Sequence, residues 1–297
     1  MHVPVMPDEV LQYLAPKPSG IYVDCTVGAG GHARRIADKL DFAGHLVGFD
    51  KDPAALELAG RALQGVAPRV SLVGASFGRM REELSRLGLA AVDGVLADLG
   101  VSSMQLEQPE RGFSFAAEGP LDMRMDPRQR LTAEQVVNQF SERELADLIF
   151  QFGEERRSRR IARAIVRSRP LRTTAQLAEV VAAASRPMNR REARLHPATR
   201  TFQALRIYVN SELQDLADWL EQLPQVLAPE GRAVVIAFHS LEDRPVKQAF
   251  QRYQREGLMR ILTPHVVRPS AAAMAANPRA RSAKLRAACR TRQGGPS

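Results

Sequence analysis

The chain has 297 residues, 44% of them hydrophobic and 25% charged, which is enough to bury a core in one large domain or in a main domain with a smaller one. Its net charge of +9 favours a polyanionic partner, and no apolar run approaches the roughly 20 residues of a membrane span, so we expect a cytoplasmic protein outside the membrane. The two cysteines, Cys25 and Cys289, lack the spacing of a zinc site or of a secreted disulfide framework, which predicts free thiols and no metal.

The first hundred residues alternate short apolar runs with amphipathic stretches, a pattern typical of a parallel sheet covered by helices on both faces. We expect strands at Ile21–Asp24, Leu46–Phe49, Val70–Val73 and Val92–Ala97, and helices at His32–Leu40 and Arg79–Leu87. The sequence therefore predicts an α/β fold with a Rossmann-like sheet.

Glycines and polar residues gather at the carboxyl ends of these strands, where open α/β sheets bind ligands. Gly28, Gly30 and Gly31 would let backbone amides approach a ligand closely, and the helix N-terminus that follows favours an anionic group such as a carboxylate. Asp50 is placed to accept both hydroxyls of a ribose. Phe77, after the third strand, can pack against an adenine face.

Two ligand classes fit this glycine loop. Gly28, Gly30 and Ala33 satisfy the dinucleotide pattern G-x-G-x-x-[GA], and Asp50 lies 22 residues beyond Gly28. An extra acid, Asp24, precedes the glycines; it would repel a pyrophosphate, but it suits the cationic ammonium or sulfonium of S-adenosylmethionine. We therefore favour a methyl donor over a nicotinamide cofactor, with capping of the loop amides as an alternative role for Asp24.

From about Glu107 to Arg206 the strand pattern stops and helical periods replace it, which predicts a helical insertion. We expect helices at Glu142–Phe152, Glu155–Ser168 and Thr174–Ala184, N-caps at Ser141 and Thr173, and interruptions at Pro187 and Pro197.

Eight arginines lie between residues 156 and 172 with no acid among them. Arg156, Arg160, Arg163 and Arg167 would share one face of a helix. Arginine side chains suit phosphate groups, although a general bias of this chain towards arginine is the alternative explanation.

The α/β pattern resumes with a helix that includes Ser211–Leu220 and a buried strand at Gly231–Phe238. His239 and Asp243 follow that strand and open onto the same edge as Asp98, so we expect them to shape an acceptor pocket. Each could equally cap the helix that begins there.

The C-terminal tail is rich in alanine and arginine and is expected to be weakly folded. From Gln251 onward it holds ten basic residues against one acid, which equals the whole net charge. Its expected partner is a polyanion, with Arg281, Lys284 and Arg286 as candidate phosphate contacts, or else it is simply solvated.

Long motifs cover nearly the whole chain. DCTVGAGGH begins at Asp24 and DGVLADLGVSSMQLEQPERGFSF at Asp93, and the chain also contains HVPVM at His2, GPLDMRM at Gly119, TFQALRIYVN at Thr201, FHSLEDR at Phe238 and NPRARSAKLR at Asn277. Together they closely resemble the bacterial RsmH (MraW) family.

The resemblance implies a class I S-adenosylmethionine-dependent methyltransferase that acts at N4 of a decoding-centre cytosine of 16S rRNA in the small ribosomal subunit. It implies a discontinuous methyltransferase domain, residues 1–106 and 207–297, and an all-helical inserted domain, residues 107–206, for which we expect RNA recognition. We also consider a homodimer. The family's cofactor positions fall on Gly30, Gly31, His32, Asp50, Phe77, Asp98 and Gln105.

The acceptor chemistry points to Asp98. The exocyclic amine of cytosine is a weak nucleophile, so the enzyme must position it and stabilise the developing cation. Asp98 can do this or can be a cofactor ligand alone, because the Pro-Pro-aromatic motif of many amino methyltransferases is absent after it. Methylation at carbon 5 would need a cysteine nucleophile, for which Cys25 and Cys289 are poorly placed.

Two rival functions stay open. One is a nicotinamide-dependent oxidoreductase, which binding of NADH against S-adenosylmethionine would distinguish. The other is a non-catalytic RNA-binding assembly factor that keeps the cofactor fold.

Overall fold

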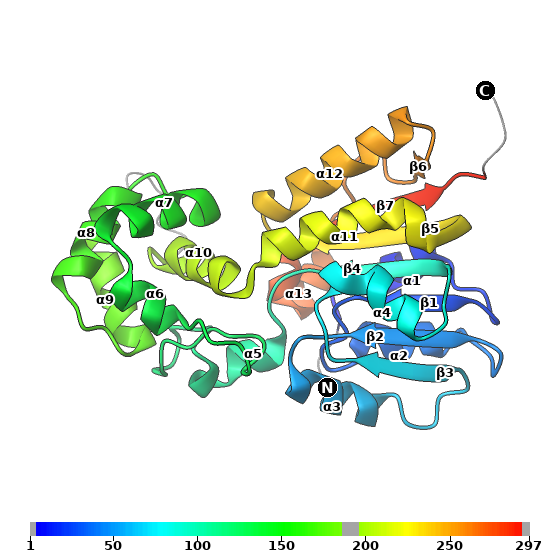
Figure 1. Cartoon of the computed structure of the whole chain (residues 1–297), viewed down its shortest axis with the longest axis horizontal. Coiled ribbons are helices and arrows are strands. Elements are labelled where there is room, and N and C mark those ends of the chain that lie inside the picture. Colours follow the sequence, from blue (N-terminus) through cyan, green and yellow to red (C-terminus); the bar gives the residue numbers. More distant parts are fainter. Residues whose placement is uncertain (1–3, 186–195, 293–297) are drawn as a thin grey trace. The chain divides into compact units, whose positions relative to one another are not determined.

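The computed structural model describes residues 4–185 and 196–292, so His2 and Pro187 lie outside the described residues. The chain forms two compact units (Figure 1): Met1–Gly100 with Leu213–Ser297, and Val101–Glu212. The expected boundaries at residues 107 and 206 both fall inside the second unit, close to its ends.

The first unit is built on a seven-stranded sheet in the order β3-β2-β1-β4-β5-β7-β6, which confirms the expected α/β class. The first five strands are parallel, and β7 is antiparallel to both of its neighbours. The strands are β1 Ile21–Asp24, β2 His45–Phe49, β3 Arg69–Val73, β4 Val92–Asp98, β5 Leu227–Ala237, β6 Met259–Ile261 and β7 Lys284–Arg290.

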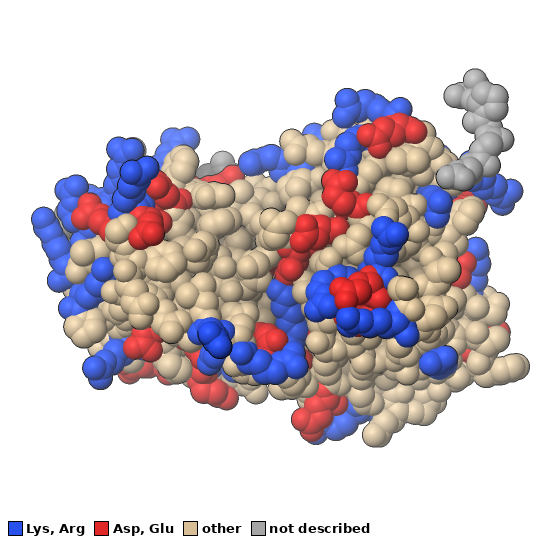
Figure 2. Space-filling model, viewed as in Figure 1, with Lys and Arg blue, Asp and Glu red and all other residues tan. Residues whose placement is uncertain are grey.

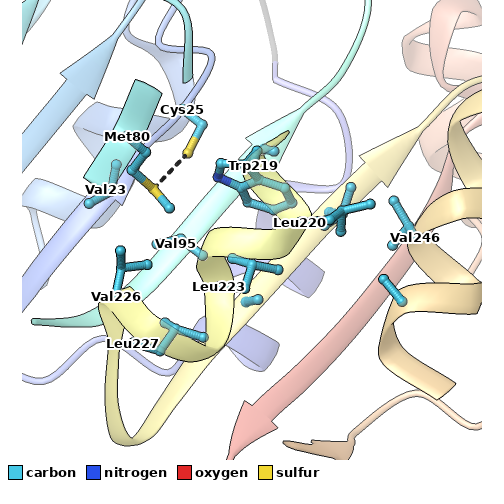
Figure 3. Close-up of a cluster of buried hydrophobic side chains, with 14 of the residues drawn as sticks. Val23, Cys25, Met80, Val95, Trp219, Leu220, Leu223, Val226, Leu227 and Val246 are labelled. Atoms are coloured by element: carbon cyan, nitrogen blue, oxygen red, sulfur yellow. Dashed lines mark hydrogen bonds between the residues drawn. The ribbon is translucent and has the colours of Figure 1, made fainter. Parts of the chain in front are cut away.

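Helices cover both faces of this sheet because alternate strand residues enter different cores. Val23 and Val95 belong to a cluster that includes Trp219 (Figure 3), whereas their neighbours Tyr22 and Leu96 belong to a second cluster. The first is completed by α4 Met80–Arg86, α11 Glu212–Val226 and α12 Ser240–Arg255, and the second by α1 Pro7–Leu14, α2 Gly31–Ala37 and α3 Pro53–Ala62.

The expectation of a weakly folded tail is wrong. The tail forms β6, a short helix α13 at Ala271–Ala276, and β7, which lies between β5 and β6. Leu285, Ala287 and Ala288 are fully buried in this strand. Basic side chains interrupt these apolar residues, so the hydrophobicity pattern of the sequence did not predict a strand.

The second unit is helical, as expected, and among its described residues no strand longer than an isolated bridge occurs. Ser141 and Thr173 are confirmed as N-caps, each in a capping box. Its helices are α5 Ser103–Glu107, α6 Ala133–Gln139, α7 Glu142–Gly153, α8 Ser158–Arg167, α9 Thr174–Ala184 and α10 Thr199–Asn210, packed around one core. In the described part of the chain, no helix is long and apolar enough to cross a membrane.

Candidate cofactor and acceptor site

The glycine loop runs from the end of β1 to the start of α2. Gly28 and Gly30 have φ angles of +51° and +84°, a region that favours glycine. A Cβ on Gly30 would lie 3.0 Å from Cβ of Ala62 and 3.3 Å from Cα of Ala59, so the loop also needs glycine there to pack against α3. The loop therefore passes close to the strand ends and to α3 at two positions where glycine is required, and its Gly28 N–H is bonded to Asp50.

Asp24 ends β1 with its side chain withdrawn from water; the residue is 1% exposed. Its Oδ1 accepts the Thr26 N–H at 3.1 Å, while Oδ2 is buried with no hydrogen-bond partner among the described residues. Burial raises the pKa of Asp24 to about 6, and the charges of Asp98 and Asp50 add to the rise against the lowering effects of His32 and of the Thr26 amide. A carboxylate of this kind is costly to keep unless a ligand uses it.

Asp50 follows β2, the parallel neighbour of β1. Its Oδ2 accepts the Gly28 N–H at 3.0 Å and its Oδ1 accepts the Asp52 N–H at 2.9 Å. Burial raises the pKa of Asp50 to about 6 as well, although these amides oppose the rise. Each carboxylate oxygen retains a lone pair for a hydroxyl donor, which fits the expected contact with a ribose.

Asp98 ends β4 on the other side of β1. Its N–H donates to Oγ1 of Thr26 at 2.8 Å, its Oδ2 lies 3.5 Å from Nε2 of His32, and its Oδ1 is buried without a hydrogen-bond partner in the described chain. The residue is thus tied to the glycine loop through its backbone, while one side-chain oxygen is available to a ligand.

Asp24, Asp50 and Asp98 form a carboxylate cluster at the ends of three adjacent strands. Burial is the main cause of the raised pKa of Asp24, and repulsion by the charges of Asp98 and Asp50 adds to it. A cation bound there would relieve this repulsion, whereas a pyrophosphate would increase it. The geometry therefore favours a cationic ligand over a dinucleotide.

Phe77 and Ser76 follow β3. Phe77 is half-buried, and its ring meets the ring of Trp219 edge-on with centroids 6.1 Å apart. Ser76 accepts the Gly78 N–H at 3.0 Å, which fixes the turn that presents Phe77. This environment suits the expected packing against an adenine.

His239 lies at the junction of β5 and α12, and β5 pairs with β4. It is the N-cap residue of α12, its Nε2 is at ion-pair distance, 3.1 Å, from Oε1 of Glu242, and neither ring nitrogen has a hydrogen-bond partner among the described residues. Glu242 is 3% exposed, and its Oε2 accepts the Phe238 N–H at 2.7 Å. Glu242 thus orients the His239 ring and leaves Nδ1 for an acceptor group.

Asp243 has a different environment from the one expected. Its carboxylate accepts from Nε of Arg286 at 2.6 Å and lies 3.5 Å from Nζ of Lys284. Burial would raise its pKa, but these two cations more than offset that effect and lower it. The ion pairs join α12 to β7, so a catalytic role for Asp243 gains no support, and Lys284 and Arg286 are engaged within the fold instead of presented to RNA.

Gln105 lies in the helical unit, where it is 3% exposed and forms a capping box with Ser102 at the start of α5. Its expected cofactor contact therefore stays a prediction. We did not predict that Thr26, two residues after Asp24, links the loop to β4 through its hydroxyl; its place in the DCTVGAGGH motif is the one signal that could have identified it.

Cys25 and Cys289 are free thiols, as expected. Cys25 lies in the first core cluster with its Sγ 3.8 Å from Sδ of Met80 and close to Trp219 (Figure 3). Burial, and then the charge of Asp24, raise the pKa of the Cys25 thiol well above its ordinary value. This thiol is thus unsuited to attack a base.

Comparison with known proteins extends over the whole chain. Residues 1–291 match the MraW methylase family. A protein named ribosomal RNA small subunit methyltransferase H from Koribacter versatilis (strain Ellin345) is 55% identical over 296 residues, covering 97% of this chain and 94% of its own. A protein of the same name from Acidobacterium capsulatum is 52% identical over 294 residues, covering 97% of each. Among solved structures, an rRNA methylase from Streptococcus thermophilus aligns with a TM-score of 0.46 and 10% identity, over 96% of this chain and 94% of its own.

Proposed function

The chain belongs to the MraW methylase family, and we propose that it transfers the methyl group of S-adenosylmethionine to N4 of cytosine 1402 in 16S rRNA. Relatives that share half or more of its residues over nearly the full length are named ribosomal RNA small subunit methyltransferase H. The sheet is of the class I S-adenosylmethionine-dependent type. The observation that carries the proposal is the carboxylate cluster of Asp24, Asp50 and Asp98 beside the glycine loop.

The residues present fit this cofactor. Asp24 offers a buried oxygen without a hydrogen-bond partner among the described residues, and this oxygen would take the ammonium group. The glycine-loop amides and the N-terminus of α2 would hold the cofactor's carboxylate, Asp50 the ribose hydroxyls and Phe77 the adenine. When bound, the cofactor supplies an electrophilic methyl group on a sulfonium.

Asp98 would act on the acceptor amine. As the new N–C bond forms, the amine gains positive charge and must lose a proton. The Asp98 carboxylate stabilises that charge, and its buried Oδ1 can accept the proton. The Thr26 hydroxyl holds the Asp98 backbone in place for this role.

His239 would orient the base from the neighbouring strand end. Glu242 holds its ring, and Nδ1 can bond to the cytosine as donor or acceptor according to the tautomer. Because the Cys25 thiol is buried with its pKa raised, an amine target fits this site better than carbon 5, which needs a thiolate nucleophile.

The helical unit would hold the RNA, and α8 offers the surface for it. Arg159, Arg160, Arg163 and Arg167 are exposed and fall within an arc of about 100° of the helix, while Arg156 precedes the helix and leaves the expected face. Of the four, Arg163 pairs with Glu142 at 3.2 Å, and the other three have no ion pair with a described residue. Figure 2 shows basic side chains gathered over this end of the unit. Exposed guanidinium groups at helical spacing suit successive phosphates of an RNA strand.

The small ribosomal subunit is the substrate we propose, in preference to free rRNA, and the cytoplasm is the compartment. A homodimer is a separate expectation, and light scattering of the purified protein would test it: a single-chain mass would reject it.

The test of the function is to incubate the protein and S-adenosylmethionine with unmethylated small subunits and to identify the modified nucleoside by mass spectrometry. We expect N4-methylcytidine at position 1402. Finding 5-methylcytidine or 2′-O-methylcytidine would contradict the mechanism, and tight binding of NADH in place of S-adenosylmethionine would contradict the cofactor assignment.

A further inference from the structure

One face of α11 supports both strand ends at which we place the adenosine half of the cofactor. Asp215, Trp219 and Gln222 are spaced four and three residues apart, so they lie on the same side of the helix. The contacts of Trp219 with Phe77 belong to the site described above, whereas those of Asp215 and Gln222 have no role in it yet.

Asp215 reaches the Asp50 turn through Lys51. The Lys51 ammonium forms an ion pair with the Asp215 carboxylate, and the two side chains are only 19% and 16% exposed. The backbone N–H of Lys51 donates to the Asp50 carboxylate. Because water screens a largely buried pair less than a surface pair, anchoring the Lys51 side chain restrains the orientation of Asp50.

Asp215 also packs against the turn that presents Phe77. A Cβ on Gly78 would lie 3.0 Å from Oδ1 of Asp215 and 3.1 Å from its Cα, so the two residues are in close contact. Nε2 of Gln222 donates to the Gly78 carbonyl at 2.6 Å. The helix therefore contacts the residue immediately after Asp50 through its side chain and the residue immediately after Phe77 through its backbone.

We propose that Asp215 is a positioning residue for the adenosine half of the cofactor, acting through Lys51 on Asp50 and through Gly78 on Phe77. This role rests on the proposed function, because it takes Asp50 and Phe77 as the adenosine site. It requires that loss of the Asp215 charge weaken binding of any ligand that contains adenosine, while turnover at saturating cofactor changes little.

The test compares Asp215→Asn with Asp218→Asn, the same substitution on the same helix at an exposed position whose carboxylate accepts from Gln214. Calorimetry would give the Kd of S-adenosylhomocysteine, and competition against it would give the Kd of adenosine. We expect Asp215→Asn to raise both constants by roughly tenfold with kcat within about twofold, Asp215→Glu to recover most of the loss, and Asp218→Asn to match the wild type. Asp24→Asn, in contrast, should weaken S-adenosylhomocysteine binding and spare adenosine.

A double-mutant cycle with Lys51→Gln separates positioning from a general loss of structure. If Asp215 acts through Lys51, the double variant binds no more weakly than the weaker single variant, and Lys51→Gln tests the same contact should Asp215→Asn fail to fold. Unchanged adenosine affinity in Asp215→Asn, or an equal loss in Asp218→Asn, would overturn the role. A wild-type protein that binds no S-adenosylhomocysteine would instead overturn the proposed function, and this role with it.

Discussion

The carboxylate cluster of the sheet unit and the arginine face of α8 place their charges in opposite ways. Burial raises the pKa of Asp24 and Asp50 to about 6, so their ionised forms cost folding free energy at neutral pH. The α8 arginines are exposed and cost little. A fold keeps costly buried charges where a ligand needs a single geometry, whereas exposed charges act together on an extended polyanion.

The largest expected effect is at Asp24. Asp24→Asn keeps the shape and the contact with the Thr26 amide but removes the charge, so we expect the affinity for S-adenosylmethionine to fall by roughly a thousandfold, as for truncation of a buried charge pair. Calorimetry would measure this, with Asp218→Asn as the control for loss of an exposed acid. An affinity within a few fold of the wild type would show that the buried charge of Asp24 does not bind the cofactor, and would contradict the difference drawn between the carboxylate cluster and the α8 arginines.

The same variant should be more stable than the wild type without ligand. In the folded wild type the pKa of Asp24 is about 6, above its ordinary value of 3.8. Between pH 3.8 and pH 6 the native protein therefore binds the Asp24 proton more tightly than the unfolded chain does. The wild type therefore loses stability relative to Asp24→Asn as pH rises from about 4 to 6, by up to about 3 kcal/mol above pH 6. Denaturant unfolding at pH 4, 5, 6 and 7 would measure the difference, and a difference independent of pH would show that Asp24 is not buried as described.

On α8 the effect should be smaller and shared. Replacing Arg159, Arg160 and Arg167 together by Gln should raise the KM for small subunits by about tenfold and leave the affinity for S-adenosylmethionine unchanged. The slope of log KM against log salt concentration should fall by an amount that corresponds to the loss of up to about three phosphate contacts. The control replaces Arg35, Arg61 and Arg69, which are exposed in the sheet unit and lie outside the basic tail. An unchanged salt slope in the α8 variant would remove RNA binding from this face.

Substitution of Asp243 should have the smallest effect on activity, because its ion pairs with Arg286 and Lys284 stabilise the fold. We expect Asp243→Asn to lower the free energy of unfolding by about 1–3 kcal/mol and to leave kcat within about twofold. A large loss of kcat with unchanged stability would restore the catalytic role that the sequence suggested and would extend the functional cluster to α12.

The sequence was most informative where burial is continuous. β1, β2 and β4 are short, largely buried runs that are followed by or end in an aspartate, so both the strands and Asp24, Asp50 and Asp98 could be located from the pattern. β7 could not, because Lys284, Arg286 and Arg290 interrupt its apolar residues, and the Asp243 carboxylate that pairs with Arg286 lies 43 residues away in the sequence.

Contacts between distant segments were equally hidden. Lys51 and Asp215 are separated in sequence by the whole helical unit, and no local pattern links them. The arginine face of α8 also differs from the predicted one. The helix begins at Ser158, after the turn that follows α7, so Arg156 lies outside it.

The central claim is that the carboxylate cluster of Asp24, Asp50 and Asp98 is built for a cation. Calorimetry of S-adenosylmethionine binding at pH 6, in buffers of different ionisation enthalpy, tests it most directly by counting the protons exchanged. Because Asp24 and Asp50 are each about half protonated there, and a bound ammonium and the ribose hydroxyls would ionise them, we expect proton release that is smaller in Asp24→Asn and absent at pH 8. Binding with no proton release at pH 6, or with proton uptake, would contradict the account.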